Sequence, residues 1–534
     1  MASGAFTVWR NSEIAVLVDI AYPLNTATRI ALGEVPYRDF PLAQAPLHFV
    51  VQAVLIRTLG PNFLVQIAYA SVLAGIAAVL AYALARRLID HVVPMPKAVA
   101  FVLVLPLIPL GIHSIYPHPF YDADACVAVL AATYLVFVAR ERRSPGMWII
   151  AGAALTLPLW IKQNIGGAFL VATIAALALE ALRQRSVSSS FRWCIAGTAA
   201  ALAIELAILH GSAGVDAYLR WGWTYALSGR GVALGRIEAF WDPRTLWPAA
   251  VLLMAVFLAR RARTPGRPVI FMTALLALGV IALVAPSLVP SVPEFFPPVM
   301  GAAAVLGAVR VRGAGATFEA MLPWVLVITA AGTFMSQGLG GSSFAIFPLL
   351  VVAGASLVRE TAWHLDRSSR VAPALAVVLS ILLVSGGTAY TLSNGRLAFV
   401  HLDPAAPVQR STFPSLAGLA TRGPYVRDLD EILYWIEAHV PAEDPLAFLP
   451  GEDPVFFALG RRPALPSVYF FDVASPLSVA DLVVAADERG LRWVFVKDRL
   501  QLVDAPPQER ELETALTQRA TFVGTIGAYR VYRR

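Results

Sequence analysis

Carboxylates gather in two short segments near the start of the chain. Asp19 and Asp39 belong to the first segment, with Arg38 nearby, and Asp122 and Asp124 belong to the second, YPHPFYDADAC. A carboxylate beside a hydroxyl group can take its proton as a general base. A pair such as Asp19 and Asp122 also offers oxygen ligands to a divalent cation, Mg²⁺ or Mn²⁺, and the spacing does not decide whether one binds.

Structural roles are the alternatives for these residues. Asp19 and Asp39 could be solvated loop charges, and Asp122 and Asp124 could stabilise the N-terminus of the helix that follows them. His118, between two prolines, could be a metal ligand or a residue that packs a loop. The sequence favours a functional role for Asp19 and Asp39 more than for Asp124 or His118.

Cations accompany these carboxylates. Lys162, in the stretch LWIKQNIGG, could be a point charge for a phosphate group or a side chain that reaches out of the membrane. Arg220 lies close to Trp221 and Trp223, and such a set binds phosphates and stacks on sugars, or anchors a protein at a membrane interface. Carboxylates together with cations suit transfer from a lipid-linked phosphate donor, because the cations neutralise charge on the leaving phosphate. Lys162, Arg38 and Arg220 are the candidates for binding this phosphate.

These residues are positioned by an unusually apolar chain. Of 534 residues, 58% are hydrophobic and 14% are charged, whereas soluble domains are about one quarter charged. We expect a polytopic α-helical membrane protein. The net charge of +7 does not indicate nucleic-acid binding, because the basic residues lie between apolar runs. Twelve apolar segments are expected to span the membrane: 63–85, 97–113, 123–139, 147–161, 165–182, 192–210, 245–260, 268–288, 295–309, 318–336, 341–358 and 371–391.

The basic residues also predict the orientation of the spans. One set of loops holds 18 Lys and Arg residues, and the opposite set, counted through residue 391, holds nine. By the positive-inside rule the first set is cytoplasmic. The loops 114–122 and 211–244 and both ends of the chain are then external, and every candidate residue named above lies on that side.

Three regions follow from this pattern. Residues 1–62 form a first external loop with an amphipathic helix on the membrane surface, and residues 63–391 form the transmembrane domain. Residues 392–534 hold 18 of the 35 acidic residues and alternate helical and β-rich segments, which predicts a small extracytoplasmic α/β domain. Because the first 62 residues lack a spanning run and yet must be external, we also consider a thirteenth, N-terminal span that precedes them.

Several motifs resemble those of the GT-C membrane glycosyltransferases. Asp19 with Tyr22, then GEVPYRDF at 33–40, PL at 46–47 and LG at 59–60, resembles their first external loop. YDADA (121–125) is similar to their second external loop, and LWIKQN (159–164) to a recurrent lysine-bearing stretch. The resemblance is to the bacterial subgroup of protein O-mannosyltransferases, lipid A aminoarabinose transferases and Rgt-type enzymes, and it extends over the whole chain.

The resemblance implies transfer of a sugar from a polyprenyl-phosphate donor at the outer face of the bacterial inner membrane. It implies Asp19 as the base or a metal-associated carboxylate, Asp122 in support and Lys162 near the donor phosphate. The chain departs from the family at Ile20, where many relatives carry a second acidic residue, and Asp19 comes early for a family whose first loop follows a spanning helix. The acceptor is a glycan, a lipid or a protein. A non-catalytic glycan-binding scaffold and a lipid or solute transporter are the alternative functions.

Overall fold

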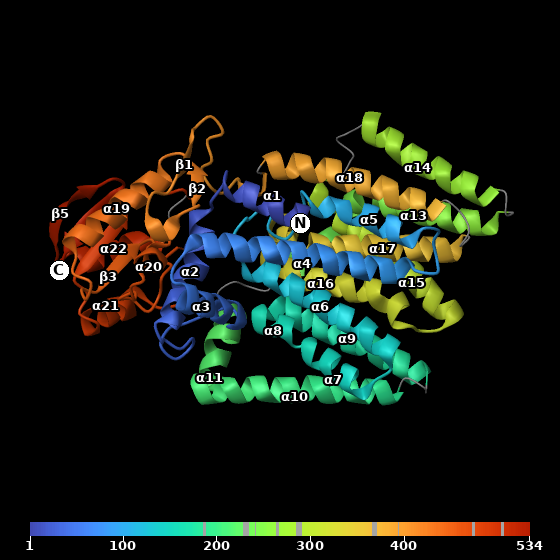
Figure 1. Ribbon diagram of the computed structural model, residues 1–534, viewed down its shortest axis with the longest axis horizontal. Helices are drawn as coiled ribbons and strands as arrows, with labels where there is room; N and C mark the ends of the chain where they lie inside the picture. Colours follow the sequence, from blue (N-terminus) through green and yellow to red (C-terminus); the bar gives the residue numbers. More distant parts are fainter. Residues whose placement is uncertain are drawn as a thin grey trace.

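The computed structural model consists of a long helical bundle with a smaller α/β domain at one end (Figure 1). It describes residues 1–184, 188–227, 234–240, 242–262, 266–284, 291–365, 371–393, 395–471, 476–503 and 507–534. The bundle helices lie roughly along one axis, and helices α2 (Leu17–Ala31) and α3 (Leu47–Leu59) lie between the bundle and the C-terminal domain. The class predicted from the sequence, a polytopic helical membrane protein with a small C-terminal α/β domain, is confirmed.

Eight described helices are long and apolar enough to cross a membrane. They lie where eight of the twelve predicted spans were expected, because runs of about 20 apolar residues are needed to cross the hydrocarbon core. They correspond to α4 (Phe63–Ile89), α6 (Tyr121–Arg142), α9 (Gln163–Arg183), α10 (Ser188–Ser212), α13 (Pro243–Arg261), α15 (Phe296–Ala314), α16 (Phe318–Ser342) and α18 (Val371–Ser393).

The other four predicted spans are not among these eight, and two of them form interrupted helices. Segment 97–113 stops early because prolines follow its first turns, and segment 147–161 divides into two helices before Lys162. These elements are α5 (Pro96–Val104) with η1 (Leu105–Leu107), α7 (Pro145–Ala154) with α8 (Leu157–Ile161), α14 (Gly266–Val284) and α17 (Phe347–His364). Short helical turns complete the bundle: α11 (Val215–Tyr218), η3 (Leu219–Tyr225), η4 (Leu234–Phe240), η6 (Val292–Phe295), η7 (Ser343–Ala345) and η8 (Gly395–Leu397).

The N-terminal region differs from the predicted loop. It forms α1 (Ala2–Asn11), which packs against α4, then α2 (Leu17–Ala31) and α3 (Leu47–Leu59). Only α3 was expected. Helix α2 has one apolar side in the core of the C-terminal domain, with Leu17, Ile20 and Leu24, while Val18 belongs to the core of the bundle. Asp19 therefore lies on a buried helix and not in a loop.

The C-terminal domain has a four-stranded sheet in the order β3-β4-β6-β5, in which β3 and β4 are parallel and the other pairs antiparallel. A separate hairpin, β1-β2, lies beside the bundle (Figure 1). The elements are β1 (Val408–Arg410), η9 (Pro414–Leu416), β2 (Ala420–Arg422), α19 (Tyr425–His439), β3 (Leu446–Leu449), α20 (Val455–Leu459), α21 (Val479–Glu488), β4 (Trp493–Lys497), α22 (Pro507–Thr517), β5 (Thr521–Ile526) and β6 (Tyr529–Arg533). One face of the sheet packs on α19, and this core extends to α2.

Candidate functional site

A cavity of about 420 Å³ lies where the bundle meets the C-terminal domain. Its charged lining residues are Asp19, Asp122, Lys162 and Arg396. They come from the first turn of α2, the first turn of α6, the junction of α8 and α9, and η8 after the last span. The structure thus brings together three of the residues predicted from the sequence and adds an arginine that was not predicted.

Asp19 is the carboxylate that faces this cavity without a direct ion pair among the described residues. The hydroxyl of Tyr116 donates a hydrogen bond to it. Burial raises the pKa of Asp19 to about 7, and the negative charge of Asp122 also raises it, while Arg396 and the Tyr116 hydrogen bond lower it. A carboxyl group with a pKa near 7 is suited to act as a general base at neutral pH.

Asp122 and Lys162 form a buried ion pair that also lines the cavity. The ammonium group of Lys162 also lies 5.2 Å from the ring centroid of Tyr121, in a cation–π arrangement. Lys162 has an extended backbone because it joins the end of α8 to the start of α9. The N-termini of α6 and α9 are therefore both at the cavity, and the partial positive charge of helix N-termini favours a bound anion.

Arg396 is the functional candidate that the sequence interpretation missed. Its guanidinium group lies 5.4 to 5.6 Å from the centroids of three rings, those of Tyr116, Phe344 and Phe399. Its Nη2 donates to the backbone oxygen of Gly341 at 2.8 Å, whereas its buried Nε has no hydrogen-bond partner among the described residues. A guanidinium that is held by these contacts and has a buried donor to spare suits an anionic ligand. The sequence did contain a signal for Arg396. This arginine follows the last span on the side of the membrane where basic residues are scarce.

A second, largely apolar cavity of about 370 Å³ adjoins the first. Tyr121, Lys162 and Ser336 line both of them. Apolar and small residues make up most of the second cavity, including Gly167, Ala168, Trp223, Leu227, Gly332 and Met335. The side chains of Trp223 and Leu227 are also exposed on the outside of the bundle. Lys162 thus lies where an apolar groove meets a polar chamber, an arrangement suited to an amphipathic ligand with a charged head.

Six predicted residues do not line either cavity, and three of them, Arg38, Asp39 and Arg220, lie at or near the surface. Arg38 and Asp39 form a surface ion pair at 2.9 Å in which Arg38 is 54% exposed, and this pair lowers the pKa of Asp39. Arg220 is exposed on η3. The sequence predicted that these three residues belong to one cluster with the others. Residues on the same side of a membrane can nevertheless be kept apart by the helices packed between them.

The other three predicted residues, Asp124, His118 and Tyr22, lie near the cavity and have structural contacts there. Asp124 accepts hydrogen bonds from the Tyr69 hydroxyl at 2.7 Å and is paired with His48 Nδ1 at 2.7 Å, so it joins α6 to α3 and α4. His118 is buried in the loop before α6, and burial lowers its pKa to about 3, which keeps it neutral.

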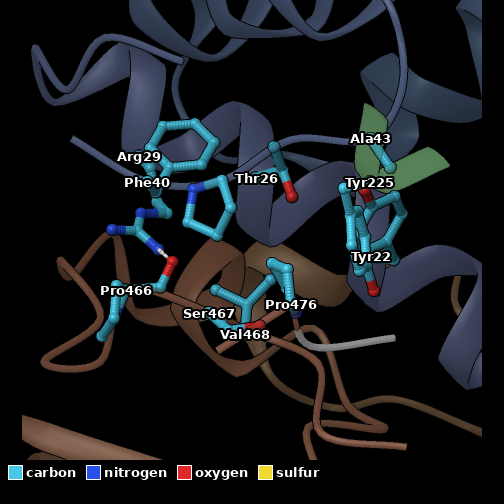
Figure 2. Close-up of a pocket in the computed structure, with 11 residues that line it drawn as sticks. Tyr22, Thr26, Arg29, Phe40, Ala43, Tyr225, Pro466, Ser467, Val468 and Pro476 are labelled. Carbon is cyan, nitrogen blue, oxygen red and sulfur yellow. Dashed lines mark hydrogen bonds between the residues drawn. The ribbon is translucent and has the colours of Figure 1, made fainter. Parts of the chain in front are cut away.

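Tyr22 also belongs to this framework. Its hydroxyl donates to Gln44, and its ring contacts that of Tyr469 in the C-terminal domain at a centroid distance of 5.9 Å. Figure 2 shows Tyr22 at one side of a small cavity between α2 and this domain.

The cavity fits a phosphate better than a divalent cation. Asp122 is already paired with the ammonium of Lys162, and Arg396 supplies a second positive charge beside Asp19. Among the described residues, no group of three or more His, Cys, Asp and Glu side chains is arranged to hold a metal ion. A cation between Asp19 and Asp122 would face both positive groups, whereas a phosphate would be attracted by them.

No protein-family model matches the sequence, and neither does any curated protein. Among solved structures, the chain is similar to the crystal structure of ArnT from Cupriavidus metallidurans bound to undecaprenyl phosphate. The identity is 14% and the TM-score 0.46, over 100% of this chain and 96% of that chain. It is also similar to the apo state of the same protein, with 14% identity and a TM-score of 0.44, over 99% and 96% of the two chains.

Proposed function

We propose that this chain is a membrane glycosyltransferase that moves a sugar from a polyprenyl-phosphate donor to a cell-envelope acceptor at the extracytoplasmic face. The observation that carries the proposal is the arrangement of Asp19, Arg396 and the Lys162–Asp122 pair around one cavity that adjoins an apolar groove. The groove suits a polyprenyl tail, and the two cations suit the phosphate to which the tail and the sugar are joined.

In the proposed reaction, Asp19 takes the proton from an acceptor hydroxyl as the oxygen attacks the anomeric carbon of the donor sugar. The bond between this carbon and the phosphate oxygen breaks, and its electron pair leaves with the polyprenyl phosphate. Arg396 and Lys162 neutralise the charge that develops on the phosphate. Asp122 holds Lys162 in place, since an unpaired ammonium at this depth would be costly.

Transfer by the purified protein in lipid tests the proposal. A panel of radiolabelled polyprenyl-phosphate sugars is offered with a crude envelope extract as acceptor. We expect label to move from one donor, and Asp19→Asn to lower this transfer by about 10²-fold or more. Lys162→Ala should raise the KM for the donor and also lower kcat, because Lys162 binds the donor phosphate in the ground state and neutralises the charge that develops on it in the transition state.

Arg38→Gln is the matched control for loss of a cation. Arg38 is exposed and lies outside both cavities, so its replacement should leave transfer unchanged. Absence of transfer from every donor would contradict the proposal and favour a scaffold or a transporter. Transfer that is unaffected by Asp19→Asn would retain the glycosyltransferase and remove Asp19 from its site.

A further inference from the structure

The C-terminal domain holds helix α2 at three points along its length. Gln501 contacts the chain where it enters the helix, Asn25 contacts the domain from the middle, and Arg29 does so near the end. Figure 2 shows the last of these, where Arg29 donates to the backbone oxygen of Pro466 at 2.7 Å. The helix that carries Asp19 is therefore positioned by a domain more than 400 residues away in the sequence.

The contact at Gln501 has a particular geometry. Its Oε1 accepts a hydrogen bond from the backbone nitrogen of Leu17 at 2.9 Å, and its Nε2 donates to the backbone oxygen of Ala15, also at 2.9 Å. Nε2 lies in addition 3.3 Å from the hydroxyl of Thr421. A primary amide that pairs with one N–H and one C=O of the same extended segment fixes the position and the direction of that segment, as a neighbouring β-strand would. Asp19 follows two residues after this clamp.

Gln501 is itself rigidly held. Its side chain is 0% exposed, and its backbone oxygen accepts from the nitrogen of His401 at 2.7 Å. The next backbone nitrogen, that of Leu502, donates to Glu452 at 2.9 Å, and Glu452 is paired with the buried Lys497 at 2.8 Å. Leu502 lines the same cavity as Asp19. The clamp thus connects the core of the C-terminal domain directly to the wall of the cavity.

We propose that Gln501 is a positioning residue that sets Asp19 in the cavity, so that the C-terminal domain is part of the catalytic machinery. This inference rests on the proposed function and extends it. The groups that face Asp19 are Arg396 from η8, Asp122 from α6 and Tyr116 from the preceding loop. Their effect on Asp19 depends on where α2 begins, and a misplacement of about 1 Å can cost 10²-fold in rate.

The test compares two amide residues that each join α2 to the C-terminal domain. Gln501→Met removes the clamp beside Asp19. Asn25→Leu removes an equivalent pair of bonds, to the oxygen of Asp453 and from the nitrogen of Phe457, both at 3.0 Å. Asn25 lies six residues after Asp19, about 9 Å further along the helix. Both variants should melt at lower temperature than the parent, so melting alone does not separate positioning from stability.

Two other measurements separate them. The first is kcat and KM for sugar transfer. The second is the pH midpoint at which a carbodiimide and an amine label Asp19, read by mass spectrometry, which requires no activity. We expect Gln501→Met to lower kcat by about 10- to 100-fold with an unchanged KM for the donor. We expect it to lower the labelling midpoint by about one pH unit, because a loosened helix start admits water to a carboxyl whose pKa burial had raised. Asn25→Leu should change both quantities by much less, because its bonds lie further along the helix from Asp19.

The outcomes are distinct. If kcat and the labelling midpoint stay at the parent's values in both variants, the positioning role of Gln501 is overturned. If the parent transfers no sugar, the proposed function fails, and the labelling midpoint still decides whether Gln501 positions Asp19. Should Gln501→Met not fold, Thr421→Val removes only the 3.3 Å contact to Gln501 and should shift the midpoint less, in the same direction. A midpoint identical to that of the parent would then refute the inference.

Discussion

Asp19→Asn is predicted to make the protein more stable at high pH while it lowers transfer by about 10²-fold or more. The pKa of Asp19 is raised from its ordinary value of 3.8 to about 7, chiefly by burial. Between pH 3.8 and about 7, the folded protein therefore retains a proton that the unfolded chain has released. Below about pH 4, Asp19 has no effect on the free energy of unfolding. The free energy of unfolding falls as the pH rises from 4 towards 7, and above pH 7 it stays lower by the full amount. Asparagine does not ionise and avoids this loss.

The magnitude follows from the difference between the two pKa values. It is about three pH units, and at roughly 1.4 kcal/mol per unit the ionised Asp19 costs the folded state about 4 kcal/mol. Thermal unfolding of the parent and of Asp19→Asn in the same lipid or detergent, from pH 4.5 to 8.5, measures this cost. The two curves should lie close together at the acidic end, separate progressively as the pH rises towards 7, and keep a constant separation above about pH 7. Transfer by the parent should increase over the same interval, as Asp19 becomes able to accept a proton.

Asp39→Asn provides the control, because Asp39 is a surface carboxylate whose pKa is lowered by its partner Arg38. It should show no gain in melting temperature at high pH and no loss of transfer. A melting temperature of Asp19→Asn that follows the parent at every pH would refute the statement that Asp19 is buried with a raised pKa. Transfer by the parent that is flat between pH 5 and 8.5 would refute its role as the titrating base.

Three further predictions follow. Arg396→Gln should move the acidic limb of the transfer profile to higher pH, because Arg396 lowers the pKa of Asp19; a limb that stays in place would contradict the contact. Lys497→Met should lower the free energy of unfolding by about 3–5 kcal/mol, since it leaves two buried carboxylates without their cation. A smaller loss than that of an exposed variant such as Arg427→Met would contradict this. Gly332→Ala would place its Cβ 2.5 Å from that of Ala168, so α16 and α9 must separate. We expect a loss of about 1–3 kcal/mol and a higher KM for the lipid donor, measured by melting and by kinetics.

The sequence predicted those features of the fold that depend on local composition. Eight spans were located because each needs a continuous apolar run, and the C-terminal domain was recognised by its charged and alternating segments. Helix α2 was mistaken for a loop for a physical reason. It is too short to span, Pro23 interrupts its pattern, and the apolar side that it buries is covered by residues of the distant C-terminal domain.

The candidate site was predicted in part for the same reason. Topology alone places Asp19, Asp122 and Lys162 on one side of the membrane, and each lies at the end of an element that reaches the cavity. It places Arg38 and Arg220 on that side as well, and cannot tell which of these residues share a cavity. The clamp by Gln501 leaves no signal in the sequence, because a glutamine in a loop acquires its partners only when the chain has folded.

The charges around the cavity also account for the use of a carboxylate that becomes neutral during the proposed reaction. With Asp19 ionised, the two cations and two carboxylates of the cavity sum to zero, and a phosphodiester donor adds one negative charge. Transfer turns the donor into a polyprenyl phosphate with a charge of about −1.5 to −2 at pH 7. If Asp19 keeps the proton of the acceptor, its lost negative charge offsets the charge gained by the phosphate. The total charge in the cavity then changes little during the reaction, which matters where low dielectric makes each uncompensated charge costly. A base with a pKa near 7 is suited to this exchange, because it can hold the proton until the phosphate leaves and then release it to water.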